Sequence, residues 1–383
     1  MDFECGVRSY WNDHCTDFLN MHRPVDKWFL SIIVTLIVVG FFIFLSASLG
    51  LLARDGAQFS GVVFNQAFSL FLGLVALYFF SRIDYRVLRK YSLYIFLLAV
   101  LVTAAVFIPS IGFGHGGATR WLSIGPFSLQ PSEFLKIGFI LYFAAWLAAV
   151  KGRVASVAYG LAPFLLVTGI VGFILLKQPD TGTFAVIFGT AAGMFLVSGA
   201  NWKHIWGVFG VALFGLATLA FTRPYVMDRI LTFFKPAVDP QGAGYQIQQS
   251  LIAIGSGEFF GRGFGQSVQK FSFLPEPISD SIFSVFSEEF GFVGGVLLIT
   301  LFMLFVLRGF MIAKNAPDAF SRLAVLGIVI LITGQAFVNI GSMLNVFPLT
   351  GLPLPFVSHG GTALIFSCAA VGIILNISRH CRA

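Results

Sequence analysis

The chain has 383 residues, of which 57% are hydrophobic and only 11% charged, with a mean hydropathy of +0.88. This composition excludes an ordinary soluble domain, in which about 25% of residues are charged. The formal net charge of +7 comes from lysines and arginines scattered along the chain, and the absence of one massed basic patch argues against nucleic-acid binding.

Apolar runs of about 20 residues recur along the chain, and each can cross about 30 Å of hydrocarbon as a helix. We predict an all-α polytopic membrane protein with ten transmembrane helices, at 28–53, 60–81, 91–109, 133–150, 155–176, 181–199, 204–222, 282–307, 322–344 and 358–378. Pro179 interrupts the stretch 155–199, between the fifth and sixth regions, so this stretch could be divided differently. We therefore expect one membrane domain, 28–378, between an N-terminal tail (1–27) and a short C-terminal tail (379–383).

Basic residues in the short loops predict the orientation of the helices. They concentrate in loops that share a side with the N-terminus, as in the cluster of Arg82, Arg86, Arg89 and Lys90, and such loops are cytoplasmic. The first 27 residues lack the pattern of a signal peptide and are interpreted as a cytoplasmic tail. An even number of helices returns the C-terminus to the same side, so the large loop 223–281 is predicted to face outward.

The first polar constellation lies in an outer loop that leads into a helix. Arg120 stands beside Trp121, and a guanidinium fixed at the membrane surface suits recognition of a diphosphate. Glu133 and Lys136 are three residues apart, so they share a helix face and can pair. A purely structural interpretation is also open, in which Ser132 caps the helix and Glu133 interacts with its dipole.

Two further segments each admit two interpretations. In Lys177–Thr183, Pro179 breaks a helix and Asp180 can cap the next one, while Lys177 could extend to the membrane surface or meet a phosphate. The segment Pro224–Pro236 is amphipathic, with its apolar face formed by Met227, Ile230, Leu231 and Phe234. It is either a helix in the plane of the membrane interface or a buried connector.

The large loop 223–281 ends at Asp280, which leads directly into an apolar helix. On that helix a polar stripe shares one face with Asp280, and it consists of Ser284, Ser287, Glu288 and Gly291. Glu288 would lie about 12 Å deeper than Asp280. Ionisable groups at this depth are costly, so the stripe should line a cavity or pack on protein rather than touch lipid. Asp280 also fits the simpler role of a helix cap.

Four stretches, in this order, resemble the SEDS family (shape, elongation, division and sporulation) of FtsW, RodA and SpoVE proteins. They are GATRWLSIGPFSLQPSEFLKI, KQPDTGT, GYQIQQSLIAIGSGEFFGRGFGQSVQKFSFLPEPISD and PLTGLPLPFVSHGGTAL. The resemblance covers nearly the whole transmembrane region. It implies a ten-helix protein of the bacterial plasma (inner) membrane with both termini in the cytoplasm, in agreement with the predicted topology.

The resemblance also implies an activity, a substrate and partners. The activity is that of a peptidoglycan glycosyltransferase, and the substrate is lipid II, a disaccharide-pentapeptide carried on undecaprenyl diphosphate. The implied partners are a class B penicillin-binding protein, which crosslinks the strands, and other membrane proteins of the divisome or elongasome.

The family's essential aspartate falls on Asp280, which we take as the catalytic candidate. The candidate substrate-binding residues are Arg120, Trp121, Glu133, Lys136, Lys177, Glu276, Glu288 and Ser358. Three positions depart from the family pattern, because Ile278 replaces a histidine, His359 stands where tyrosine is usual, and Thr350 is a RodA-like feature. The GSGEFFGRGFGQS and QKF stretches lean toward FtsW and thus toward cell division.

Polymerisation requires a base for the sugar hydroxyl and positive charge for the departing diphosphate. Our hypothesis gives the first role to Asp280 and the second to Arg120, with Lys136 or Lys177. The sequence has no dedicated metal motif, and a divalent cation such as Mg²⁺ or Mn²⁺ stays open as a further carrier of charge. Three alternatives also stay open: a transporter that flips lipid II, an elongation-type RodA polymerase and a scaffold without catalysis.

Overall fold

The computed structural model describes residues 24–52, 56–109, 111–115, 118–124, 127–236, 239 and 242–381. Most of the predicted N-terminal tail, with Cys5 and Cys15, lies outside the described residues, as do the last two residues of the C-terminal tail.

Long apolar helices make up most of the described chain. Nine spans within it are long and apolar enough to cross a membrane. Their helices are α2 (Lys27–Leu52), α3 (Gly56–Arg82), α4 (Tyr85–Ala104), α5 (Pro131–Val150), α6 (Ala162–Lys177), α8 (Trp202–Thr222), α12 (Ile282–Lys314), α13 (Ala319–Met343) and α14 (Gly361–Ser378). A further apolar helix, α7 (Thr181–Val197), has 17 residues. An apolar helix thus lies in each of the ten predicted regions, while the number that cross the membrane stays a prediction.

Shorter elements connect these helices. They are η1 (Ala105–Phe107), η2 (Lys151–Ala155), the π-helix η3 (Val157–Leu161), α9 (Pro224–Phe234), α10 (Ala243–Ser256) and α11 (Gln269–Ser272). The amphipathic segment predicted at 224–236 does form a helix. Leu231 and Phe234 are exposed on it, which favours a position at the membrane interface over a buried connector.

The outer loop before α5 is a small antiparallel sheet, which corrects the prediction of a plain loop. Its strands β1 (Gly112–His115), β2 (Ala118–Ile124) and β3 (Phe127–Leu129) pair in the order β1-β2-β3. Phe113 pairs with Trp121, and Leu122 pairs with Leu129. Threonine, tryptophan and isoleucine in β2 favour strands, but such short strands form only when they pair with one another.

The start of α5 also differs from the prediction. Gln130 is the N-cap and Pro131 is the first helical residue, so Ser132 is not the cap. Proline suits this position because the first backbone N–H groups of a helix lack partners within it. Glu133 lies in the first turn, as predicted.

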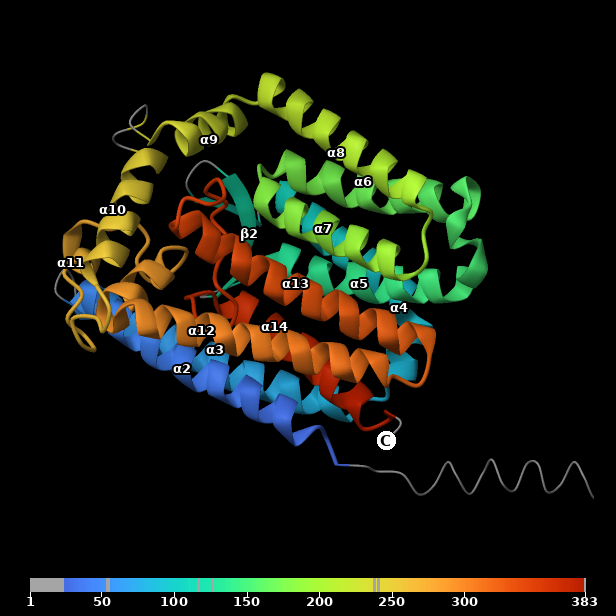
Figure 1. Cartoon of the computed structure of the whole chain (residues 1–383), viewed down its shortest axis with the longest axis horizontal. Helices are drawn as coiled ribbons and strands as arrows, with labels where there is room; N and C mark the ends of the chain where they lie inside the picture. Colours follow the sequence, from blue (N-terminus) through green and yellow to red (C-terminus); the bar gives the residue numbers. More distant parts are fainter. Residues whose placement is uncertain are drawn as a thin grey trace, which may run out of the picture.

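Contacts between distant segments define two ends of the helix bundle. At one end Asp26 pairs with Arg308 at 2.8 Å, and its backbone N–H donates to Ser378 Oγ at 3.2 Å. At the other end Lys270 Nζ reaches Ser46 Oγ in α2 at 3.2 Å. Figure 1 shows α9, α10 and α11 gathered there, far from the C-terminus. We call this the loop end.

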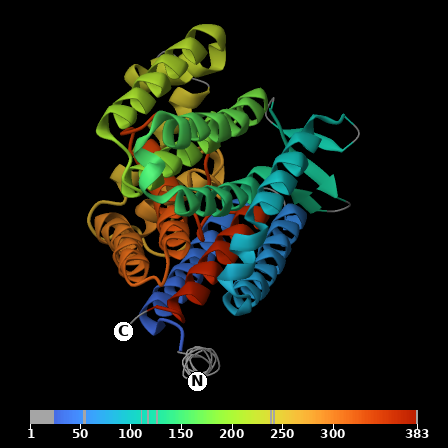
Figure 2. The same cartoon turned by 90° about the vertical axis from the view of Figure 1, so that its right-hand side faces the viewer.

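The core is formed mainly by α5, α13 and α14, and side chains of α2, α6, α7 and α12 pack against them. Figure 2 shows these helices packed together in a second view. Aromatic rings join these helices: Phe143 contacts Phe164 edge-on, and Phe164 stacks on Phe195 with ring centroids 5.1 Å apart. The outer helices instead expose large apolar side chains, such as Phe214 and Phe221 in α8. Exposed hydrocarbon of this kind is expected where a helix faces lipid.

Candidate functional site

Asp280 lies at the loop end, just before α12, and does not cap that helix. Ser281 is the N-cap and makes no side-chain capping bond, so the interpretation of Asp280 as a cap is wrong. The Asp280 carbonyl oxygen accepts a hydrogen bond from Asn339 Nδ2 at 2.8 Å. A Cβ atom added to Gly351 would lie 3.6 Å from Asp280 Oδ2, which places the half-buried carboxylate beside this glycine. The Asp280 carboxylate is therefore not used to cap α12.

The segment before Asp280 is fixed by Ser358 and its neighbours. Ser358 Oγ donates to the carbonyl of Ser279 at 2.6 Å and accepts from the N–H of Leu354 at 2.8 Å. The N–H of His359 donates to the carbonyl of Ile278 at 2.8 Å. Ser358 is buried and holds backbone on both sides. This arrangement makes it a positioning residue for Asp280.

Glu276 occupies a tight turn in the same segment. Its φ of 46° is in the left-handed region, and its carbonyl accepts from the N–H groups of Ser279 and Ser281, each at 3.2 Å. Such a conformation is uncommon for a residue with a side chain. The side chain of Glu276 is exposed, so the structure links this residue to the shape of the turn before Asp280.

Arg120 projects from β2 onto the turn between α6 and α7. Its guanidinium donates to the carbonyl oxygens of Gln178, at 3.3 Å, and Pro179. The carboxylate of Asp180 accepts from the N–H of Thr183 at 3.3 Å, which confirms the predicted cap of α7. Arg120 therefore holds the α6–α7 turn through neutral carbonyl groups.

Arg229 in α9 enters the same region, and the sequence reasoning missed it. Its guanidinium is 3.5 Å from the carbonyl oxygen of Thr350, the residue before Gly351. A Cβ added to Gly182, in the first turn of α7, would meet that same oxygen at 2.9 Å. Arg229 is three residues from Val226, which the structure buries, and the two share a helix face.

Burial and charge set the protonation of this cluster. Burial raises the pKa of Asp280 above its ordinary value, and the hydrogen bond from Ser279 and the charges of Arg229 and Arg120 oppose the shift. Burial also lowers the pKa of Arg229, and the neighbouring Arg120 lowers it further. His359 has a pKa lowered by burial, which favours a neutral ring that is 3.0 Å from Gln66 Oε1.

Glu133 and Lys136 form the predicted pair, at 2.8 Å, but deep within the protein. Each side chain is 4% exposed, and Lys136 Nζ also donates to Gln335 Oε1 at 2.7 Å. Gln335 in turn donates to the carbonyl of Pro353 at 2.8 Å. Contact between this pair and a substrate would require these bonds to break. The geometry instead indicates that the pair joins α5, α13 and the segment before Ser358.

Glu288 is fully buried and holds the loop segment 262–270. Its carboxylate accepts from Ser267 Oγ at 2.6 Å and from the N–H of Val268 at 3.1 Å, and it is 3.6 Å from Arg262. This confirms that the polar stripe of α12 packs on protein. Its carboxylate oxygens thus bind the loop, and contact between Glu288 and a substrate stays a prediction.

Trp121 and Lys177 lie nearer the surface. Trp121 is half-buried on β2, and exposed Lys177 places its ammonium 4.8 Å from the ring centre of Phe173. This cation–π contact fits the interpretation in which Lys177 extends along the apolar surface. Contact with a phosphate stays a prediction.

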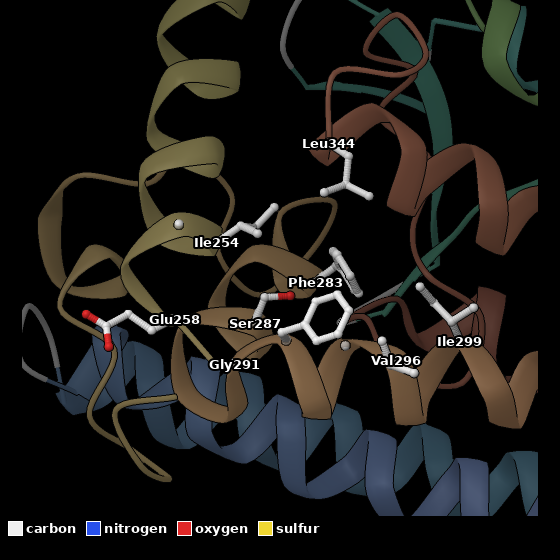
Figure 3. A pocket seen from close by; sticks show the side chains of 11 residues that line it. Ile254, Glu258, Phe283, Ser287, Gly291, Val296, Ile299 and Leu344 are labelled. Carbon is white, nitrogen blue, oxygen red and sulfur yellow. The ribbon is translucent and has the colours of Figure 1, made fainter. Parts of the chain in front are cut away.

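An apolar pocket of about 290 Å³ lies between α10, α12 and the end of α13. Figure 3 shows Ile254 on one side, Phe283, Ser287 and Val296 on the other, and the carboxylate of Glu258 at the edge. Phe283, which lines the pocket, lies in the first turn of α12 and follows Asp280 by three residues in the sequence. The mainly hydrocarbon lining of the pocket suits an apolar chain.

The loop end thus combines a carboxylate with a raised pKa, two guanidiniums and nearby apolar surface. A carboxylate of this kind can accept a proton from a substrate hydroxyl, and guanidiniums can bind an oxyanion. Among the described residues, no group of three or more His, Cys, Asp and Glu side chains could hold a metal ion.

Comparison with known proteins agrees with this arrangement. Residues 27–383 match the FtsW, RodA and SpoVE family, described as "Cell cycle protein". The stage V sporulation protein E of Bacillus subtilis (strain 168) is 39% identical over 311 residues, covering 81% of this chain and 85% of that protein. A probable peptidoglycan glycosyltransferase FtsW of Geobacter metallireducens is 40% identical over 314 residues, covering 82% of this chain and 84% of that protein.

A solved structure gives the same fold. It belongs to a study of how a peptidoglycan synthase complex coordinates polymerization and crosslinking. Its matching chain has a TM-score of 0.77 and 29% identity, and the match covers 93% of this chain and 98% of that one. With a family match that spans nearly its whole length, the chain belongs to the FtsW, RodA and SpoVE family of cell cycle proteins, which are multi-pass proteins of the bacterial inner membrane.

Proposed function

We propose that the chain is a peptidoglycan glycosyltransferase that polymerises lipid II into glycan strands at the outer face of the membrane for cell division. The names of its relatives support the activity, because several are probable peptidoglycan glycosyltransferases of the FtsW type. The observation that carries the mechanism is the position of Asp280, which is half-buried, within electrostatic reach of Arg229 and Arg120, and free of any capping role.

In the proposed reaction, Asp280 is the general base. A sugar hydroxyl attacks the anomeric carbon of the neighbouring substrate, and its proton passes to the Asp280 carboxylate. A glycosidic C–O bond forms while the bond from that carbon to the lipid diphosphate breaks. A diphosphate leaves as a stable anion, so no second carboxyl group has to protonate it as in a glycosidase.

Positive charge is required where the diphosphate departs, and Arg120 is the proposed source. Lys177, exposed at the neighbouring end of α6, is the further candidate from the sequence. Mg²⁺ or Mn²⁺ could share this charge if carboxylate and phosphate oxygens held it together, since the described residues offer no group of three or more His, Cys, Asp and Glu side chains for a metal. The apolar pocket beside Phe283 supports the accommodation of a prenyl chain close to Asp280.

Replacement of Asp280 tests this function. The Asp280→Asn protein, purified and given lipid II, is expected to form glycan about 10²- to 10⁴-fold more slowly, the usual effect of a lost general base. Asp228→Asn, which changes an exposed carboxylate in α9, is the matched control and should polymerise normally. Undiminished chain formation by Asp280→Asn would remove Asp280 as the base.

A lipid II transporter is the competing function. A transporter concentrates its polar groups midway across the membrane, whereas Asp280, Arg120 and Arg229 gather at the loop end. Labelled lipid II in vesicles separates the two functions. A polymerase lengthens glycan without moving lipid between leaflets, and a transporter does the reverse.

We further propose a class B penicillin-binding protein as partner. The structural relative supports this, since it belongs to a complex that couples polymerization and crosslinking. Co-purification with candidate transpeptidases and measurement of glycan length with each would identify the partner. Transpeptidases of cell division and transpeptidases of elongation are tested separately. If polymerisation depends on the elongation transpeptidase alone, the chain belongs to the elongation type.

A further inference from the structure

Arg120 on β2 and Arg229 in α9 contact two neighbouring turns, and neither has a carboxylate within 4.0 Å in the described part of the chain. Four ion pairs lie within 4.0 Å there, and neither arginine belongs to one. Arg120 bonds to the carbonyls of Gln178 and Pro179, and Arg229 to that of Thr350. Each guanidinium has five N–H donors, so donors remain on both for another acceptor.

The same two turns bring the arginines to Asp280. Gly182 follows the turn that Arg120 holds, and it lies against the Thr350 carbonyl that Arg229 contacts. Gly351, the next residue, adjoins Asp280 Oδ2. The proposed base and both cations therefore surround one short stretch of backbone, although they come from β2, α9 and the end of the large loop.

Unpaired charge at partly buried positions is costly, and proteins normally pair such groups. Here both arginines are half-buried, and they repel each other. Two buried hydroxyl oxygens on the same segments, Thr350 Oγ1 and Tyr225 Oη, have no hydrogen-bond partner. Asp180 and Asp280 attract Arg229, but no carboxylate of the described chain lies within 4.0 Å of either arginine. Two adjacent guanidiniums without a contacting carboxylate can form a site for a ligand with two negative groups.

We propose that Arg229 acts with Arg120 as a paired site for the two phosphates of a prenyl diphosphate. The inference rests on the proposed function and extends it to a residue in α9. Planar guanidiniums bind phosphate in a bidentate manner, and two of them match the two phosphates of one diphosphate. As Asp280 accepts the proton, its negative charge disappears while charge grows on the leaving diphosphate, so the attraction of the arginines for Asp280 no longer competes with their attraction for that anion.

Binding of the leaving group, measured without turnover, tests this proposal. The probe is farnesyl diphosphate, titrated into the purified protein in detergent by calorimetry. Arg229→Gln and Arg120→Gln are each expected to weaken its binding about 10- to 100-fold, the loss for one or two charge-assisted hydrogen bonds. Arg223→Gln removes an exposed arginine six residues earlier, at the N-cap of α9, and is the matched control, with binding unchanged.

Two comparison ligands define what the site recognises. Inorganic pyrophosphate should compete with the probe, and its competition should also depend on Arg229. Farnesyl monophosphate should bind the unmodified protein more weakly than the diphosphate. Equal binding of the two farnesyl ligands would show that the site recognises the farnesyl group rather than the diphosphate, and it would overturn the proposal.

Further variants separate this proposal from the proposed function. Asp280→Asn should lose polymerisation but keep binding of the probe. Wild-type binding in Arg229→Gln overturns the role of Arg229, whatever the result for Asp280. Arg229→Lys keeps the positive charge, and it replaces Arg229→Gln as the test if the glutamine variant does not fold. It should lose much of the preference for diphosphate over monophosphate, because lysine lacks the fork geometry, and a full preference would contradict the proposal.

Discussion

Glu289 in α12 and Lys270 in the loop form an ion pair of 2.7 Å in which neither side chain is more than 1% exposed. The ammonium of Lys270 also donates to the carbonyl of Gly265 at 2.9 Å and to Ser46 Oγ in α2. Next to this pair, Glu288 holds the same loop through Ser267. The loop that leads to Asp280 is thus fastened to α12 and α2 by buried charges.

Lys270→Met should destabilise the protein strongly. The substitution leaves the Glu289 carboxylate buried without its cation, and removal of one partner from a buried pair costs about 3–5 kcal/mol. Thermal unfolding in detergent should show the loss, and the double variant Lys270→Met/Glu289→Gln should recover part of it. Arg308→Met, at the partly exposed pair with Asp26, is the control and should cost less.

Gly291 should not tolerate a side chain. It has a φ of 65° inside α12, and an added Cβ would lie 2.4 Å from the backbone nitrogen of Gly261. Gly291→Ala should therefore lower the melting temperature, because both the backbone conformation and the clash oppose it. Gly295→Ala, one turn later, is the matched control, since its Cβ would meet nothing closer than 3.7 Å. Equal melting temperatures of the two variants would contradict this prediction.

The positions of the helices could be predicted because the thickness of a membrane fixes the length of an apolar run. The sheet could not, since its strands of four, seven and three residues carry no long periodic pattern. Trp121 and Arg120 therefore appeared to lie in a plain loop. Their actual positions depend on pairing between strands, which is a tertiary property.

The site was predictable in part. Asp280 and Arg120 were identified, and the structure brings both to the loop end with Ser358. The sequence could not show which carboxylate is available for catalysis and which is structural. Glu288 is bound by the loop and Asp280 is not, and this difference arises from tertiary packing. Arg229 was missed since its segment was judged by its apolar face, whereas the direction of one side chain depends on contacts with Thr350.

Lys136→Met should lower the stability of the protein, and any loss of polymerisation activity should follow from that loss of stability. The substitution leaves Glu133 buried and unpaired, so the expected loss is again about 3–5 kcal/mol, measured by thermal unfolding. The double variant Lys136→Met/Glu133→Gln should regain stability and much of the polymerisation activity. A double variant that is stable but inactive would restore the interpretation of this pair as a substrate contact.

Ser358→Ala should reduce polymerisation through the position of Asp280. The hydroxyl group joins the carbonyl of Ser279 to the N–H of Leu354, and its loss leaves both buried groups without that partner. The expected cost is about 1–3 kcal/mol of stability, with a lower kcat. Ser358→Thr keeps the hydroxyl and should retain more activity than the alanine variant, and equal activities would argue against the hydrogen bonds as the cause.

Asp280→Asn should be inactive and yet more stable near neutral pH. Burial raises the pKa of Asp280, so the folded protein holds this proton more tightly than the unfolded chain does. The free energy of unfolding therefore falls as pH rises from about 3.9, the ordinary value of an aspartate, through the raised pKa of the folded state. Asparagine has no such proton, and its advantage in melting temperature should vanish in acid.

The same shift sets the pH dependence of turnover. The base acts only as a carboxylate, so kcat/KM of the unmodified protein should fall as the pH drops through the raised pKa of Asp280. Asp280→Glu keeps a carboxylate and, where it retains activity, should keep an acid limb in its profile. Two results together would contradict a raised pKa of Asp280. The first is an acid limb of the unmodified protein at the ordinary aspartate pKa, and the second is a melting temperature equal to that of Asp280→Asn at neutral pH.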